Sequence, residues 1–166
     1  MQSSTPQIGD PRIARALTHA ESVCRQRKLA FTPLRRQVFE LVCHHPNPVG
    51  AYELLGELKV ARGNAAPVTV YRALDFLIDA GLVHRIAALN AFTACHTRSP
   101  GHGGLLLVCG KCSNVIELED LDVGERIVQS AAGVHFAASS DLVEVRGLCE
   151  ECRGEPSAAR VSAAEE

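Results

Sequence analysis

The sequence contains no long apolar run: no stretch of its 166 residues approaches the about eighteen consecutive apolar side chains of a membrane-spanning helix. Its first ten residues also lack the cationic region followed by an apolar core that is typical of a secretory leader. These absences predict a soluble, cytoplasmic protein that has no membrane partner. With 46% hydrophobic and 22% charged residues the chain is expected to fold, as one ordinary domain or two small ones.

The sequence also lacks a strong overall charge, because its net charge is −2. This near balance conceals two halves of opposite sign. Residues 1–88 contain 11 Lys and Arg against 7 Asp and Glu, whereas residues 89–166 contain 6 against 12. A basic half is suited to phosphate groups, so the first half is the candidate nucleic-acid-binding part.

Four segments of the basic half have the apolar spacing and the boundaries of helices. The first covers residues 11–28, and the second begins with Thr32 as N-cap and Pro33 at the first helical position. The third covers residues 51–61. The fourth begins at Pro67 and ends before Gly81, the natural C-terminal stop.

A hairpin is expected directly after the fourth helix, with strands at residues 82–86 and 91–96 around a turn at Leu89-Asn90. Helices followed by such a β-wing indicate a winged helix-turn-helix. Beyond Pro100 the pattern changes to strands at 105–109 and 115–118, a helix at 121–132, and strands at 134–138 and 142–148. The sequence therefore predicts an α+β protein: an N-terminal winged helix-turn-helix domain and a small C-terminal α/β domain.

Four of the seven cysteines form two Cys-x-x-Cys pairs, Cys109 with Cys112 and Cys149 with Cys152. Four thiolates are the ligand set of a closed tetrahedral structural zinc site. The 36 residues between the pairs are more than a compact zinc ribbon uses, but a helix and two strands would fill the interval. The alternative is that each pair is an independent redox motif, although neither pair lies at the start of a thioredoxin-like βαβ unit.

A second possible metal site involves the wing. His84 and Cys95 are equidistant from the Leu89-Asn90 turn, so a symmetric hairpin makes them cross-strand partners at a separation suited to sharing one metal. His102 and Glu117 could complete a shell of nitrogen, sulfur and oxygen ligands. Each of these residues taken singly is more typical of an ordinary surface position.

The fourth helix is the candidate recognition helix, because Thr69, Tyr71 and Arg72 lie near its start. Arg72 lies opposite the apolar stripe and is the best candidate to read a guanine; a phosphate contact is the alternative. Arg35 is expected to contact the DNA backbone. The same role is expected of four further basic residues, Arg36, Arg25, Arg27 and Lys28.

Six segments together resemble the ferric uptake regulator family, and they span roughly residues 15–152. They are Phe31-Thr-Pro-Leu-Arg35, Pro67-Val-Thr-Val-Tyr-Arg-Ala-Leu-Asp-Phe-Leu77, Gly81-Leu-Val-His-Arg85, Ala94-Cys-His96, Cys109-Gly-Lys-Cys112 and Gly147-Leu-Cys-Glu-Glu-Cys152. The cysteine in the wing, and the absence of a paired histidine run before Cys109, are more similar to the zinc uptake branch than to the iron or peroxide sensors.

The resemblance implies two zinc ions per chain: a structural one held by the four paired cysteines, and a regulatory one held by His84, Cys95, His102 and Glu117. It also implies a homodimer that binds an inverted-repeat operator in double-stranded DNA and represses zinc uptake genes. The expected organisation is a flexible N-terminus at 1–11, a winged-helix domain at 12–87 and a hinge at 88–99. A metal-binding dimerisation domain at 100–152 and a disordered tail at 153–166 follow.

Three alternatives differ in function. An iron or peroxide sensor would share the fold, but the soft thiolate of Cys95 favours zinc. A zinc-binding interaction module would bind no DNA. A zinc nucleobase deaminase would need a Pro-Cys-x-x-Cys motif, which the sequence does not contain, so no enzyme activity is expected.

Overall fold

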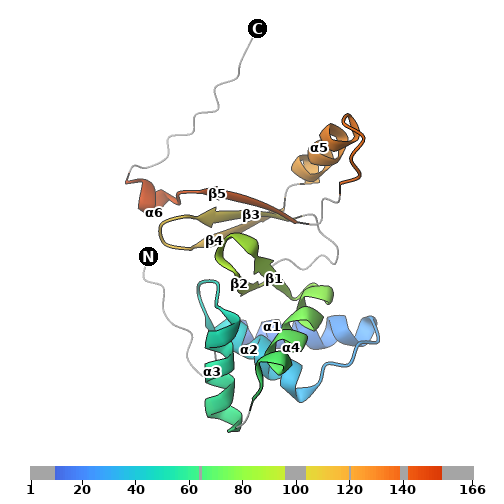
Figure 1. Cartoon of the computed structure of the whole chain (residues 1–166). Helices are drawn as coiled ribbons and strands as arrows, with labels where there is room; N and C mark the ends of the chain where they lie inside the picture. Colours follow the sequence, from blue (N-terminus) through green and yellow to red (C-terminus); the bar gives the residue numbers. More distant parts are fainter. Residues whose placement is uncertain (1–9, 64, 96–103, 120, 139–141, 155–166) are drawn as a thin grey trace.

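A computed structural model of the chain describes residues 10–63, 65–95, 104–119, 121–138 and 142–154 (Figure 1). The first four helices are α1 (Pro11–Gln26), α2 (Pro33–His44), α3 (Ala51–Arg62) and α4 (Pro67–Asp79). They pack together at one end of the molecule, and a three-stranded sheet lies at the other. Among the described residues no helix is long and apolar enough to cross a membrane.

The helix boundaries follow the capping chemistry of the sequence. The Asp10 carboxylate accepts a hydrogen bond from the Arg12 backbone N–H at 2.8 Å, and Thr32 Oγ1 accepts one from the Arg35 N–H at 3.4 Å. Gly81, with φ of 71°, closes α4 by donating its N–H to the Ile78 carbonyl. The predicted caps of α2 and α4 are confirmed.

The helices enclose one apolar core. The residues that the helical spacing selects in α1 and α4 are all buried in it: Ile13, Leu17, Ala20, Cys24, Val70, Ala73, Leu74 and Leu77. Leu54 and Leu58 of α3 complete the centre with no exposed surface. Burying a leucine side chain contributes on the order of 1.5–3 kcal/mol, so this core holds α4 firmly against the other helices.

A hairpin of β1 (Val83–Ile86) and β2 (Ala91–Ala94) follows α4, as the winged-helix prediction requires. A 3-10 turn, η1 (Ala87–Leu89), joins the strands and ends at Asn90 in the left-handed conformation. Val49 adds a short antiparallel bridge to Phe92, which fixes the hairpin to the segment before α3.

The register of this hairpin differs from the prediction. His84 is paired with Thr93, not with Cys95, because the connection consists of four residues, 87–90, and is centred one residue earlier than expected. Cys95 lies just beyond β2, where its N–H donates to the Leu82 carbonyl at 2.9 Å. It therefore occupies a diagonal position on the same face as His84.

The second sheet has the strand order β4-β3-β5. Strand β3 (Gly104–Cys109) is antiparallel to β4 (Val115–Glu119) and parallel to β5 (Leu142–Gly147), while α5 (Leu121–Ala132) forms the crossover. Ile86 of the wing packs against Leu106 and Val108 of β3 in a small buried cluster. The hairpin thus lies between the helices and this sheet (Figure 1).

Two details of the C-terminal half differ from expectation. Residues 134–138 are not a strand: the chain turns after α5, His135 has φ of 60°, and the Phe136 N–H donates back to the Ala131 carbonyl. A short helix, α6 (Glu150–Arg153), instead follows β5, so Arg153 belongs to an ordered turn and not to a tail. Residues 155–166 lie outside the described residues.

Candidate metal centres and DNA-binding surface

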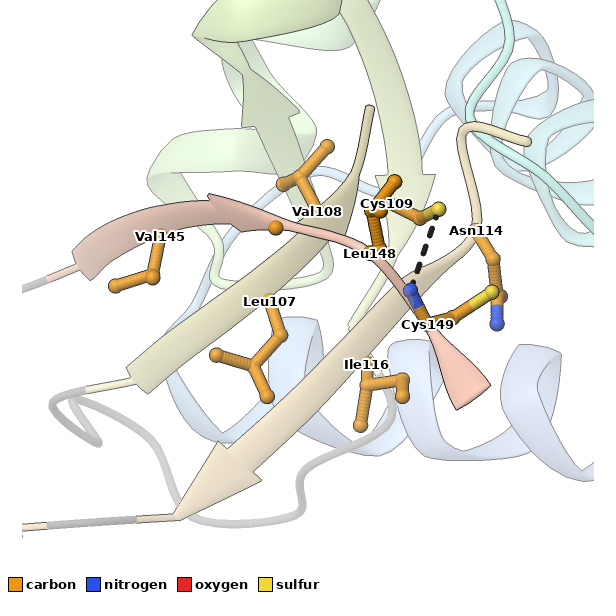
Figure 2. A pocket seen from close by; sticks show the side chains of 9 residues that line it. Leu107, Val108, Cys109, Asn114, Ile116, Val145, Leu148 and Cys149 are labelled. Atoms are coloured by element: carbon orange, nitrogen blue, oxygen red, sulfur yellow. Dashed lines mark hydrogen bonds between the residues drawn. The ribbon is translucent and has the colours of Figure 1, made fainter. Parts of the chain in front are cut away.

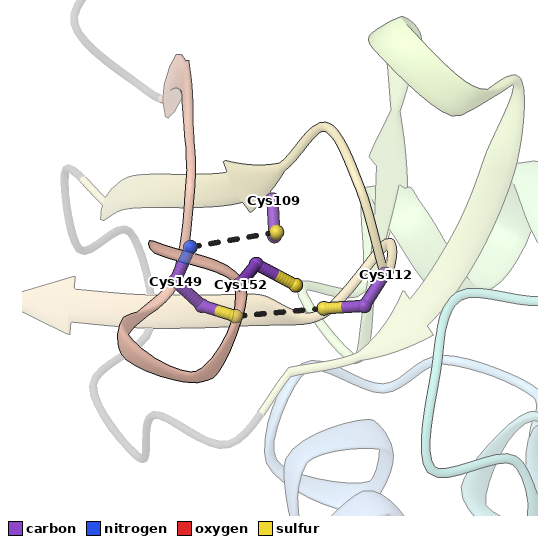
Figure 3. Close-up of side chains that lie close together, drawn as sticks. All are labelled: Cys109, Cys112, Cys149 and Cys152. Atoms are coloured by element: carbon purple, nitrogen blue, oxygen red, sulfur yellow. Dashed lines mark hydrogen bonds between the residues drawn. The ribbon is translucent and has the colours of Figure 1, made fainter. Parts of the chain in front are cut away.

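The four paired cysteines converge at one end of the second sheet (Figure 3). Cys109 ends β3, Cys112 lies in the turn before β4, and Cys149 and Cys152 lie at the start and within α6. Their sulfur atoms all lie within 4.8 Å of one another, and Cys112 Sγ and Cys149 Sγ are 3.6 Å apart. Tetrahedral zinc with bonds of about 2.3 Å places its sulfur ligands about 3.8 Å apart, so the four thiols fit this ion.

The surroundings of the sulfur atoms also suit a cation. Backbone N–H groups at Cys112, Cys149 and Lys111 lower the pKa of Cys109 to about 6, so this thiol ionises at neutral pH. Hydrogen bonding with the Cys149 thiol, followed by burial, raises the pKa of Cys152 to about 12. A cation bound by all four sulfurs would displace the remaining protons.

A shallow apolar hollow of about 140 Å³ adjoins this cluster on the outer face of the sheet (Figure 2). Leu107, Ile116 and Val145 line it, and Leu148 closes it next to Cys149. Ile116 of β4 and Val145 of β5, on either side of Leu107 of β3, are each 44% exposed, so the sheet presents an apolar patch to solvent. This outer face is apolar, and among the described residues its side chains stay partly exposed.

A second group of possible ligands lies between the wing and the sheet. His84 Nε2 is 3.0 Å from Glu117 Oε1, and Cys95 Sγ is 3.6 Å from the same oxygen. The side chains of His84 and Glu117 are only 12% and 8% exposed. One nitrogen, one sulfur and one oxygen therefore meet within 4.8 Å of one another, a set that suits zinc.

Three of the four residues predicted for the second metal site are thus brought together, although the hairpin register that suggested pairing His84 with Cys95 is wrong. Cys95 lies diagonal to His84 and not opposite it, but the two side chains can still share one metal because Glu117, from β4, approaches both. His102 lies outside the described residues, as does His96.

A third group, His45 with Glu53 and Glu57, meets the same distance limit on the helical side of the molecule. His45 caps the end of α2, and its Nε2 lies 2.8 Å from Glu57 Oε1 in α3. This contact joins α2 to α3.

The start of α4 presents the predicted DNA-reading residues at the surface. Arg72 is exposed, Tyr71 is 40% exposed, and Thr69 is half-buried in the first turn. Val68, which the sequence reasoning missed, is 55% exposed next to them. An exposed valine here can contact the methyl group of thymine, as arginine can pair with guanine.

Two arginines expected at the DNA backbone also make contacts within the chain. The Arg35 guanidinium lies 3.6 Å from the centre of the Phe76 ring and donates to the Ala30 carbonyl. Arg27 donates to the carbonyls of Ala80 at 3.0 Å and Asp79 at 3.2 Å, where α4 ends. Both side chains therefore hold α4 in place, and this role was not apparent from their spacing in the sequence.

The model of the ferric uptake regulator family matches residues 26–145, more than half of the chain. The chain belongs to the ferric uptake regulator family. The zinc uptake regulation protein of Escherichia coli (strain K12) is 36% identical over 137 residues, which are 82% of this chain and 80% of that protein.

Solved structures agree with this membership in the ferric uptake regulator family. A zinc uptake regulator in complex with zinc and DNA has 35% identity and a TM-score of 0.78, over 85% of this chain and 95% of that chain. XcZur in its holo form has 39% identity and a TM-score of 0.75, over 84% and 97%. Its apo form has 40% identity but a TM-score of only 0.51, over 85% and 97%. This member of the family is therefore arranged more like the holo form than like the apo form.

The remaining cysteines of this family member have a different character. Cys24 is buried with 1% exposure, and Cys43 packs partly against the same core. Burial raises the pKa of Cys43 to about 12. Both thiols stay protonated at neutral pH and behave as small apolar side chains.

Proposed function

We propose that this chain is a zinc-responsive, DNA-binding transcriptional regulator that represses zinc uptake genes as a zinc-loaded homodimer. The observation that carries the proposal is the group of His84, Cys95 and Glu117. It joins the wing, which follows the candidate recognition helix, to the sheet of the other half. A ligand set in this position couples zinc concentration to the orientation of α4.

We assign two zinc ions to each chain. Cys109, Cys112, Cys149 and Cys152 are the proposed structural site, and His84, Cys95 and Glu117, with His102, are the proposed regulatory site. Bound zinc supplies fixed tetrahedral bonds that hold its ligands together without redox chemistry. Support comes from the donor atoms and their convergence within 4.8 Å in each described group.

The proposed division of the chain follows from the pairing of its strands. The DNA-binding part runs from about residue 12 through the hairpin, because β2 pairs with β1 and cannot belong to a separate hinge. Residues 104–153 form the second part. Its outer apolar face, with Leu107, Ile116 and Val145, is the proposed homodimer interface.

DNA recognition is assigned to α4. Thr69, Tyr71 and Arg72 would face the major groove, and a two-fold dimer would place two copies of α4 on the halves of an inverted repeat. The relative solved with zinc and DNA supports this assignment for a chain of 35% identity. The paired thiols suit the reducing cytoplasm, and we assign the chain no enzyme activity.

An iron or peroxide sensor of the same family is the second candidate. The thiol of Cys95 in the regulatory group favours zinc, since thiolate is a soft ligand. The proposal is tested with purified dimer, metal analysis and DNA binding in the presence and absence of chelator. We expect about two zinc ions per chain, and binding that zinc restores but iron or manganese does not; zinc-independent binding, or none, would contradict the proposal.

A further inference from the structure

Glu144 of β5 contacts the wing at a point distinct from the candidate metal site. Its Oε1 accepts a hydrogen bond from the Ala87 N–H at 2.7 Å, and its Oε2 accepts one from the Ala88 N–H at 3.2 Å. These two N–H groups begin η1, where a 3-10 turn offers them no carbonyl of its own. One half-buried carboxylate therefore binds both, across more than 50 residues of sequence.

The strand register places Glu144 in one row with Glu117. Leu106 in the central strand is paired with Glu117 on one side and with Glu144 on the other. The two carboxylates therefore point to the same face, roughly 10 Å apart, since neighbouring strands are about 4.8 Å apart. Between them Leu106, fully buried, packs against Ile86 of the wing.

The wing is thus attached to the sheet at two points. Glu117 meets His84 on β1, and Glu144 meets the turn that follows β1. A single attachment would allow the helical part to rotate about it, whereas two attachments separated by a buried apolar contact fix one orientation. The Glu144 contact uses only backbone donors, so none of its atoms belongs to the candidate metal site.

We infer that Glu144 is a positioning residue: it is the permanent pivot about which the helical part turns when the site at His84, Cys95 and Glu117 opens and closes. This inference rests on the proposed zinc-dependent DNA binding. With the pivot intact, zinc binding at the other point selects one orientation of α4. Without it, zinc still binds, but the orientation is no longer defined.

The test compares Glu144→Ala and Glu144→Gln with Glu125→Ala, a matched control at an exposed carboxylate of α5. Three quantities are measured on the full-length dimer: zinc per chain, DNA affinity at saturating zinc, and hydrogen exchange of the Ala87 and Ala88 amides by NMR. For Glu144→Ala we expect unchanged zinc content, roughly tenfold weaker DNA binding and at least about tenfold faster exchange at both amides, as loss of hydrogen bonds to a charged group implies. Glu144→Gln keeps one acceptor oxygen and is expected to be intermediate, and Glu125→Ala to match the wild type.

The amides of Ala87 and Ala88 are also measured in wild-type protein treated with chelator, where a pivot requires them to stay protected. Their deprotection on zinc removal would overturn the inference, as would wild-type DNA affinity in Glu144→Ala. If Glu144→Ala is unfolded, the intermediate values expected of Glu144→Gln decide the question. Failure of the proposed function can be distinguished from failure of this inference. In that case the wild type itself would bind DNA without regard to zinc, while its Ala87 and Ala88 amides remained protected.

Discussion

The arginines near α4 have different roles because their surroundings differ. Arg27 and Arg35 have their guanidinium groups engaged with carbonyls and the Phe76 ring, whereas Arg72 is exposed near the start of the helix. A guanidinium group that is already hydrogen-bonded has fewer donors to offer to DNA. Arg72 is therefore the better candidate for reading a base, and Arg35→Ala is expected to weaken the fold in addition to any effect on DNA binding.

Arg72→Ala is expected to reduce the binding free energy for operator DNA by roughly 1–3 kcal/mol and to relax preference at one base pair of each half-site. The physical reason is loss of a bidentate contact with guanine. Affinities are measured for operator and scrambled duplexes at several salt concentrations with zinc saturating. Arg126→Ala, an equal charge change on the exposed surface of α5, serves as control. Equal losses on both duplexes would instead make Arg72 a phosphate contact.

Cys95 and Thr93 form a matched pair for the regulatory site. Cys95 approaches Glu117, while Thr93 is the direct cross-strand partner of His84. Cys95→Ser is expected to lower zinc from about two ions per chain to about one and to abolish the zinc response of DNA binding, with the dimer intact. Thr93→Ala should change neither quantity by more than about twofold, since Thr93 is half-buried beside the site but is not one of its candidate ligands. An undiminished zinc response in Cys95→Ser would remove this thiol from the site.

At the level of elements, α4 is held along its length and at its C-terminal end. The apolar stripe packs into the core, and Arg27 from the end of α1 binds the last carbonyls of α4. A cation there also interacts favourably with the negative end of the helix dipole. The direction in which α4 presents Arg72 to DNA therefore depends on α1.

Arg27→Ala is expected to lower the free energy of unfolding of the helical part by about 1–2 kcal/mol, because two carbonyls lose a charged donor. Arg25→Ala, two residues away and exposed, removes the same charge and is expected to cost less than about 0.5 kcal/mol. Denaturant unfolding followed by circular dichroism measures both changes. Similar costs for the two variants would show that the contact with α4 contributes nothing beyond net charge.

On the scale of the whole molecule, the sequence was most informative where periodicity and capping decide the structure. The buried residues of α1 and α4, the Cys-x-x-Cys cluster and the winged-helix order all followed from local spacing. What local spacing could not reveal depends on the geometry of a turn or on contacts between distant segments. The hairpin register depended on the 3-10 turn at η1, and the parallel pairing of β3 with β5 placed Glu144 beside the wing. Val134 and Phe136 alternate like strand residues but are 75% and 65% exposed, since the turn after α5 diverts the chain.

The two candidate zinc sites occupy different places in the architecture, and this difference predicts the order in which metal is lost. The four cysteines all belong to the second part of the chain, so their zinc would link β3, the turn before β4 and α6 within that part. His84, Cys95 and Glu117 join two parts; the helical part has its own large core, and only the small cluster of Ile86, Leu106 and Val108 is shared with the sheet. A ligand present at about a thousandfold above its Kd stabilises the state that binds it by about 4.1 kcal/mol, so removal of the structural ion should unfold a small domain.

Graded chelation should therefore proceed in two steps. In the first, about one zinc per chain is released and DNA binding is lost, while the dimer and the thermal transition of the second part persist. In the second, which needs a stronger chelator, the remaining zinc leaves and the dimer dissociates. Zinc content, sedimentation velocity and DNA binding are followed along one chelator series. Cys112→Ser, which lacks one thiol of the structural set, should lose that ion and the dimer without chelator. Loss of both ions, DNA binding and the dimer in a single step would contradict the assignment of separate structural and regulatory roles.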